Sequence, residues 1–156
     1  MIMQKHIQKI DNLNTTNIDN LTIEKLGHFN LFSGTVKNGY QDIFPNMVNE
    51  LDFVPFDIEV YSFTDFLKDV HYSELKDDIK NIFYLIESRK AQIFATTQRL
   101  DVIQAFAEVA QEYKDVEAYY YRLGRSARDS NKGQSIVTMY ETDRLLELTS
   151  KNREVR

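Results

Sequence analysis

Two glycines, Gly34 and Gly39, enclose a short loop with the spacing of a phosphate-binding loop. In such a loop backbone N–H groups surround phosphate oxygens, and Lys37 would add a positive charge. A working loop also has a lysine and a serine or threonine after the second glycine, which neutralise phosphate and hold magnesium. Tyr40 and Gln41 stand there instead. The pattern predicts either a phosphate loop without these two groups or an ordinary turn.

A second group of polar residues follows an apolar run. Ile93–Ala95 is typical of a buried strand, and Thr97, Gln98 and Arg99 come soon after it. At a strand tip Thr97 and Gln98 can hydrogen-bond a nucleophilic water, and Arg99 can pair with phosphate through two bonds. The same residues also fit a plain strand-to-helix connection, with Thr96 or Thr97 as a helix cap. The sequence leaves both interpretations open.

Aromatic and basic residues alternate in a third candidate site, formed by Tyr119, Tyr121, Arg122 and Arg125. Tyrosine rings beside arginines can stack on nucleic-acid bases. The same residue types are enriched at the centres of protein–protein interfaces. We interpret this segment as a partner-binding surface in preference to a base-stacking one.

The sequence gives little support for a metal site, a serine nucleophile or a nuclease site. There is no cysteine. The three histidines, His6, His28 and His71, lack the spacing of metal ligands, so no metal site is expected. No serine lies in a Gly-x-Ser-x-Gly elbow. Asp57 and Glu59, with Lys68 or Lys90, loosely fit a carboxylate-plus-lysine nuclease site, but alternating acids on a strand more often face solvent.

Composition limits the class of protein. The chain has 156 residues, 42% of them hydrophobic, and a net charge of -5, so we expect one domain that is no generic nucleic-acid binder. No apolar run is long enough for a membrane span, and residues 1–6 lead into no apolar stretch, so a cytoplasmic protein without membrane contact is expected. Acidic residues gather in 42–87. Basic residues gather after Glu117, as a solvated surface or as a face for phosphate or an acidic partner.

The element pattern predicts an α/β domain. Alternating strands and helices indicate a small, mainly parallel sheet flanked by helices, with ligands at the carboxyl ends of its strands. The expected strands are 28–32, 56–63, 92–97, 116–123 and 135–140. The expected helices are 42–51, 73–89 with Ser73 as N-cap, 101–114 and 142–148. The alternative is a mostly helical bundle in which 101–123 is one helix.

The two ends of the chain are expected to differ from this domain. Residues 1–26 are rich in Asn, Asp and Thr, which favours an irregular arm. Its apolar residues are enough to attach it to a core: Ile7, Ile10, Leu13, Ile18, Leu21 and Leu26. Residues 27–150 form the predicted domain, and 151–156 a charged tail.

Residues 80–122 resemble the region around two core strands of DNA-pumping P-loop ATPases, the HerA/FtsK-type and zonula-occludens-toxin-like enzymes of phages and mobile elements. The matching pattern is a helix ending in Ser88-Arg89-Lys90, the strand Ile93-Phe94-Ala95, Thr96-Thr97-Gln98-Arg99, a helix over 101–113, and the aromatic strand Tyr119-Tyr120-Tyr121-Arg122.

The resemblance implies a layered sheet, ATP with magnesium as cofactor, duplex DNA as a partner and a phage or mobile-element origin in a bacterial cell. It also implies that Gln98 is the catalytic glutamine, that Gly34–Gly39 is the phosphate loop, and that Asp65 is the acid near the end of the second strand. This chain lacks the family's Lys-Ser/Thr and has one acid where the family has a pair.

These departures favour a scaffold that has lost hydrolysis. Our leading hypothesis is therefore a non-catalytic protein–protein interaction protein, with a protein partner or self-association and no cofactor. The alternative is a nucleotide-binding relative of the DNA translocation and packaging ATPases. Both depend on one spatial expectation, namely that the strand tips at Gly34 and Gln98 lie close together.

Overall fold

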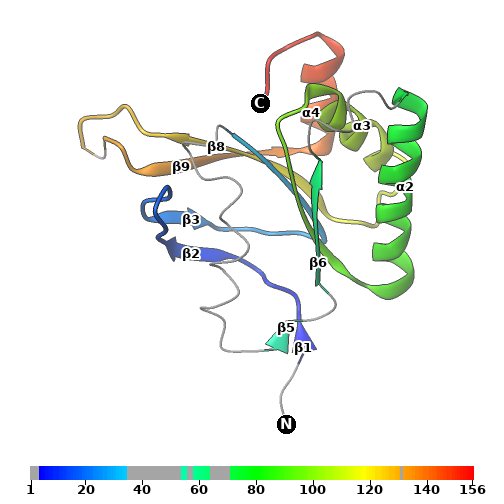
Figure 1. Cartoon of the computed structure of the whole chain (residues 1–156), viewed down its shortest axis with the longest axis horizontal. Helices are drawn as coiled ribbons and strands as arrows, with labels where there is room; N and C mark the ends of the chain where they lie inside the picture. The colour runs from blue at the N-terminus through cyan, green and yellow to red at the C-terminus, as the bar shows by residue number, and fades with distance from the viewer. Residues whose placement is uncertain (1–3, 35–53, 56–57, 64–70, 131) are drawn as a thin grey trace.

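The computed structural model describes residues 4–34, 54–55, 58–63, 71–130 and 132–156 (Figure 1). Its strands are β1 (Gln4–Lys5), β2 (Ile10–Leu13), β3 (Leu21–Ile23), β4 (Phe29–Ser33), β5 (Val54–Pro55), β6 (Ile58–Phe63), β7 (Gln92–Thr97), β8 (Ala118–Arg125) and β9 (Ser135–Glu141). Its helices are α2 (Tyr72–Arg89), α3 (Leu100–Ala110) and α4 (Thr142–Ser150). The helix expected over 42–51 lies outside the described residues.

A five-stranded sheet in the order β6-β7-β4-β8-β9 forms the centre of the molecule. Strands β6, β7, β4 and β8 are parallel, and β9 runs antiparallel to β8 at one edge. This confirms the predicted α/β class and excludes the helical bundle. The segment 101–123 is a helix followed by a strand, because α3 ends at Ala110 and β8 begins at Ala118.

Side chains alternate strictly between the two faces of this sheet, as strand geometry requires. Phe29 and Leu31 of β4 point to the face that we call the helix face, where α2, α3 and α4 pack (Figure 1). The Phe29 ring lies 4.9 Å from the ring of Phe106 in α3 and 5.0 Å from that of Phe83 in α2. The helix face is therefore held by a largely apolar core rich in aromatic rings.

Helix α2 matches the helix predicted over 73–89, but it begins differently. Ile79, Ile82, Phe83 and Ile86 are buried at the three- and four-residue spacing that puts them on one side. The N-cap is His71, with no capping bond from its side chain, so Ser73 is not the cap and lies inside the first turn. The helix ends at Arg89 because the next residue, Lys90, has a left-handed φ of 55° that breaks the repeat.

The opposite face, the arm face, is covered by residues 6–26. This arm is irregular over most of its length, as expected, but contains the short antiparallel β2–β3 hairpin. All of its predicted apolar anchors are buried against Phe32, Phe94, Tyr121 and their neighbours: Ile7, Ile10, Leu13, Ile18, Leu21 and Leu26. The burial of these side chains therefore holds the arm on the sheet, although the arm has little regular structure.

Buried amide side chains also join the arm to the sheet. The Gln92 amide accepts from the N–H of Ile7 at 2.7 Å and donates to its carbonyl at 2.7 Å. The Asn30 amide does the same for Gly27, at 2.8 Å in both directions, and its oxygen also accepts from Tyr121 at 3.2 Å. The sheet thus supplies hydrogen bonds that the irregular backbone of the arm cannot make within itself.

No helix in the described part of the chain is long and apolar enough to cross a membrane.

Candidate functional site at the carboxyl edge of the sheet

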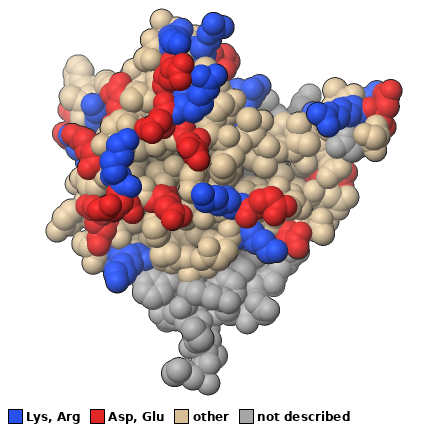
Figure 2. Space-filling view, turned by 180° about the vertical axis from the view of Figure 1, so that it is seen from behind, with Lys and Arg blue, Asp and Glu red and all other residues tan. Residues whose placement is uncertain are grey.

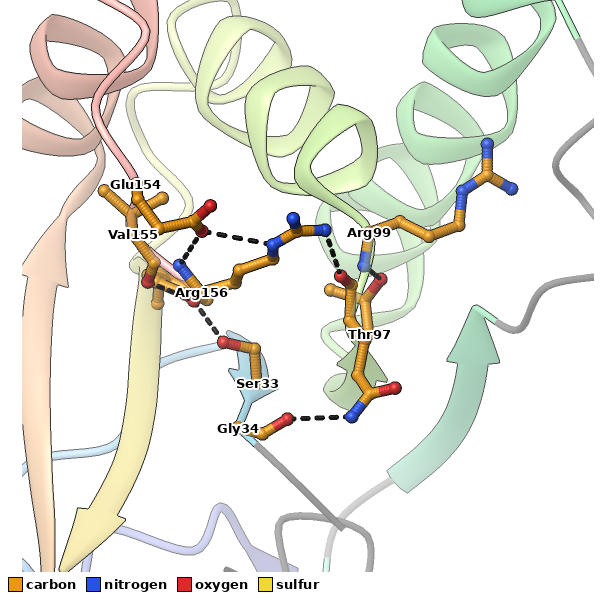
Figure 3. Close-up of polar contacts among 9 residues, drawn as sticks. Ser33, Gly34, Thr97, Arg99, Glu154, Val155 and Arg156 are labelled. Carbon is orange, nitrogen blue, oxygen red and sulfur yellow. Dashed lines mark hydrogen bonds and ion pairs between the residues drawn. The ribbon is translucent and has the colours of Figure 1, made fainter.

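The carboxyl ends of β4 and β7 lie side by side because the two strands are parallel and adjacent. The amide nitrogen of Gln98 donates to the carbonyl oxygen of Gly34 at 3.0 Å (Figure 3). This confirms the expectation that the two strand tips come together. Ligands of parallel α/β sheets bind outside this edge, so it is the first place to look for a site.

Thr97 and Arg99 have local partners at this edge. The hydroxyl of Thr97 accepts the backbone N–H of Arg99 at 3.0 Å, at the start of α3. The Arg99 guanidinium forms two bonds to the Asp101 carboxylate, at 3.0 and 2.5 Å. Figure 3 shows this guanidinium directed away from Gly34. In this arrangement both residues support the strand-to-helix connection, which was one of the two interpretations that the sequence left open.

The segment 154–156 covers the same edge (Figure 3). The Arg156 guanidinium donates to the Gln98 carbonyl at 3.3 Å and pairs with Glu154 at 3.2 Å. Val155 is buried, and its carbonyl oxygen accepts the Tyr120 hydroxyl at 2.7 Å. The sequence suggested a charged tail here, and no pattern indicated that it packs onto the strand tips.

Tyr120 connects this segment to β4. Its hydroxyl proton goes to Val155, so Ser33 donates its own hydroxyl proton to the Tyr120 oxygen. Burial raises the pKa of Tyr120 well above its ordinary value, although the Ser33 bond and the nearby Arg122 charge act in the opposite direction. Tyr120 therefore stays neutral and serves as a hydrogen-bond donor.

The remaining residues predicted for nucleotide chemistry are not described by the structure. Lys37 and Gly39 of the glycine loop, and Asp65, lie outside the described residues. The carboxylates of the nuclease hypothesis, Asp57 and Glu59, also have no described side chains. Their roles stay predictions.

Tyr119 and Tyr121 do not form the partner-binding surface that the sequence suggested. They are 8% and 0% exposed, because both rings point to the arm face and are covered by the arm. The Tyr121 hydroxyl donates to the Lys25 carbonyl at 2.6 Å, and the Lys25 ammonium lies 4.9 Å from the centre of the Tyr119 ring. Their rings belong to the core and are out of reach of a base or a partner.

The two arginines of that segment are exposed, but they differ in their contacts. Arg125 donates to the Gly133 carbonyl at 2.9 Å and to the Asn17 carbonyl, so it joins the β8–β9 turn to the arm. Arg122 lies opposite Ser33 and Thr138, near the carboxyl edge of the sheet. Of the four predicted partner-binding residues, Arg122 is the one that lies at the same edge of the sheet as Gly34 and Gln98.

The basic residues near the C-terminus are largely paired within the chain. Arg144 and Lys151 both contact Glu147, at 3.1 and 3.2 Å, and Arg156 contacts Glu154. Figure 2 shows Lys and Arg interspersed with Asp and Glu over the described surface of the face in view. Such a mixed surface attracts a phosphate backbone weakly.

A small hollow of about 390 Å³ lies at the opposite, amino end of the sheet, lined by His6, His28, Glu87 and Asp115 among others. The two imidazoles meet edge to face at 5.4 Å. Among the residues that the structure describes, no three His, Asp or Glu side chains gather in a way that could hold a metal ion.

Edge strand β9 carries exposed apolar side chains that the sequence analysis did not single out. Ile136 is 41% exposed and Met139 is 39% exposed, while Tyr84 on α2 is a third large exposed side chain at 62%. The run 135–140 was read as a strand, but its position at an edge of the sheet depends on the order of the strands. That order was not available from the sequence.

Comparisons with known proteins give no relative. No family model matches the chain, and no curated protein and no solved structure matches it.

Proposed function

We propose that this chain is a non-catalytic protein–protein interaction protein built on a degenerate P-loop-like scaffold. One observation supports the proposal most. Four described polar side chains at the carboxyl edge of the sheet are bonded within the chain: Ser33 to Tyr120, Gln98 to Gly34, Thr97 to Arg99, and Arg99 to Asp101, although Nη1 of Arg99 is buried without a partner among the described residues. Groups held in this way are poorly placed to orient a nucleophilic water.

The exposed apolar strand β9 supports the interaction part of the proposal. Large apolar side chains on an edge strand are costly to leave in water and invite pairing with another chain. Ile136 and Met139 lie on the two opposite faces of that strand, so a partner strand at this edge would cover both. The phage or mobile-element origin and the cytoplasmic location remain predictions.

A second candidate function, nucleotide binding as in a DNA translocation ATPase, is favoured by the approach of Gln98 to Gly34 at 3.0 Å. A nucleotide there would need magnesium, and it would have to share the edge with Arg156, which is bonded to the Gln98 carbonyl. Duplex DNA would be the further partner under this hypothesis.

Calorimetry and a phosphate-release assay distinguish the two functions. The full chain is titrated with ATP and with ADP in millimolar magnesium, beside the variant Gln98→Ala. Gln104→Ala is the matched control, because Gln104 bonds to Glu108 on α3 and not to a strand tip. We expect no heat of binding and no turnover. ATP turnover that Gln98→Ala removes and Gln104→Ala retains would overturn the proposal in favour of the ATPase.

A further inference from the structure

The outer edge of β9 has backbone groups available for another strand. The Ser135 N–H points away from β8 and donates to the Asp19 carbonyl at 2.9 Å. Because backbone groups alternate in direction along a strand, Val137 and Met139 also direct their N–H and C=O groups away from β8. No described segment hydrogen-bonds to those groups. Within 136–140 the outward-directed backbone groups of Val137 and Met139 therefore have no hydrogen-bond partner among the described residues, although β3 lies close to β9.

The side chains of residues 136–140 could pack against the same side chains of a second copy. Tyr140 lies opposite Tyr120 of β8 and Ile136 opposite Gly124, so both are on the helix face. Val137 and Met139 lie opposite Leu123 and Tyr121, on the arm face. No charged residue occurs between positions 136 and 140.

We propose that β9 pairs antiparallel with β9 of a second copy of this chain, with Thr138 opposite the partner's Thr138. This inference rests on the proposed interaction function and names its partner. In this register Val137 meets the partner's Met139 on the arm face. Ile136 meets the partner's Tyr140 on the helix face.

This register agrees with the directions of the backbone groups. Residues that exchange two hydrogen bonds must both point their backbone groups at the partner, and Val137 and Met139 do so. The Thr138 pair then falls at a non-hydrogen-bonded position on the twofold axis. If the register shifted by one residue, backbone groups directed at the partner strand would lie opposite groups directed at β8. The hydrogen bonds between the two β9 strands would then be lost.

The charges at the two ends of β9 favour the same antiparallel direction. The β8–β9 turn carries exposed Arg128 and Lys132 with Asp129 between them, and the opposite end carries exposed Glu141, beside Arg144 and an Asp143 that is paired with Lys114. A twofold axis through Thr138 brings the turn of each copy, which is net positive, toward Glu141 of the other. A parallel pairing would instead bring like charges together, which opposes association.

Sedimentation or light scattering of the full chain tests the dimer. We expect a mass twice that of the monomer at high micromolar concentration, and dissociation on dilution. Met139→Lys puts a charge at the pairing edge and is expected to raise the dimer dissociation constant about tenfold or more. Tyr84→Lys is the matched control, since it removes an exposed apolar side chain from α2, and it should leave the constant unchanged. Unfolding midpoints close to that of the parent chain show that both variants are folded.

A single introduced thiol tests the register, because the chain has no cysteine of its own. At a non-hydrogen-bonded antiparallel pair the Cα atoms are about 4.5 Å apart, which is within the range of a disulfide. Thr138→Cys is therefore expected to form a covalent dimer on mild oxidation. Ser88→Cys, an exposed position on α2, should remain largely monomeric under the same conditions.

The outcomes separate this inference from the proposed function. A chain that stays monomeric at every concentration overturns the β9 pairing. So does a dimer that ignores Met139→Lys and does not cross-link through Thr138→Cys, because its interface then lies elsewhere. Neither result bears on the absence of ATP turnover. Conversely, Gln98-dependent turnover in a dimer that cross-links through Thr138→Cys would overturn the proposed function and leave the pairing intact.

Discussion

The two faces of the central sheet are covered in different ways. On the helix face the sheet contributes apolar side chains such as Phe29 and Leu31 to a core with the helices. On the arm face it contributes apolar side chains as well, but Asn30 and Gln92 reach the backbone of the N-terminal segment with their amides. Both amides are fully buried.

The difference follows from how each covering segment satisfies its own backbone. A helix bonds its N–H and C=O groups internally, so a sheet that packs against it needs to supply only apolar surface. An irregular segment has unpaired backbone groups, and burying them without partners costs free energy. The amides of Asn30 and Gln92 provide those partners to Gly27 and Ile7. The buried amides of Asn30 and Gln92 thus mark the face that the irregular segment covers.

The largest effect is expected on the helix face. Phe106→Ala removes a fully buried ring that contacts Phe29 and Phe83 and leaves a cavity. We expect a loss of about 3–5 kcal/mol in the free energy of unfolding, measured in urea. Tyr84→Ala, at an exposed site on α2, should change it by less than about 0.5 kcal/mol. Equal losses in the two variants would contradict the core described here.

The second largest loss of stability is expected from a substitution on the arm face, and it should be confined to the arm. Gln92→Leu keeps the volume but leaves the N–H and C=O of Ile7 without their partners, which should cost about 2–3 kcal/mol. Hydrogen exchange should speed up in the arm more than in α2 and α3. Gln104→Leu is the control, since that amide bonds to Glu108 on the helix surface. Uniform acceleration over the whole chain would show that the arm is not a separate unit of stability.

Gly27, where the arm joins β4, allows a test with a smaller expected effect. It measures how closely the backbone at this junction packs against Glu117 and Tyr119. A Cβ at this position would stand 2.5 Å from the Glu117 carbonyl oxygen and 2.8 Å from the Tyr119 ring. Gly27→Ala should therefore destabilise the chain by about 1–3 kcal/mol in urea unfolding. At Gly124 the nearest atom to such a Cβ is 4.0 Å away, so Gly124→Ala should cost far less. Similar costs at both glycines would argue against the tight junction.

The smallest effect is a dependence on pH at the amino end of the sheet. Burial lowers the pKa of His28 below its ordinary 6.5, with His6 acting in the same direction and Glu117 opposing it. Nδ1 of His28 also accepts the Glu117 N–H at 3.0 Å, which requires that this nitrogen be unprotonated. As the pH falls below about 6.5 the unfolded chain takes up the proton more readily, so stability decreases.

Urea unfolding between pH ~7.5 and ~5.5 measures this decrease. His28→Asn retains an acceptor for the Glu117 N–H and does not titrate, so its stability should fall less over the same range. If the variant and the parent chain lose stability equally, other groups are responsible for the dependence on pH.

The sequence predicted most elements because their signals are local. The stripe of Ile79, Ile82, Phe83 and Ile86 and the run Gln92–Thr97 each identify an element from a few neighbouring residues. The approach of Gly34 to Gln98 was also predicted, since parallel strands end at one edge of a sheet, and the structure adds that β4 and β7 are neighbours. The N-cap of α2 was assigned to Ser73 instead of His71, because cap positions depend on where the preceding chain enters the helix.

The candidate site depended more strongly on distant contacts. Tyr119 and Tyr121 were expected at a surface because aromatic and basic residues alternate there, and no local signal shows that the arm, about a hundred residues earlier in the chain, covers them. Arg156 was assigned to a charged tail, although it bonds to the Gln98 carbonyl. The exposed edge at Ile136 and Met139 required the strand order, which local periodicity does not contain.

By itself, the sequence determined the class of this protein: a cysteine-free α/β chain whose strands and helices alternate. These properties follow from composition and from periods of two and of three to four residues. The tertiary structure alone decided which face the arm covers, which strand is left at the edge and what occupies the strand tips. Those features arise from contacts between residues far apart in the chain, and a local pattern carries no record of them.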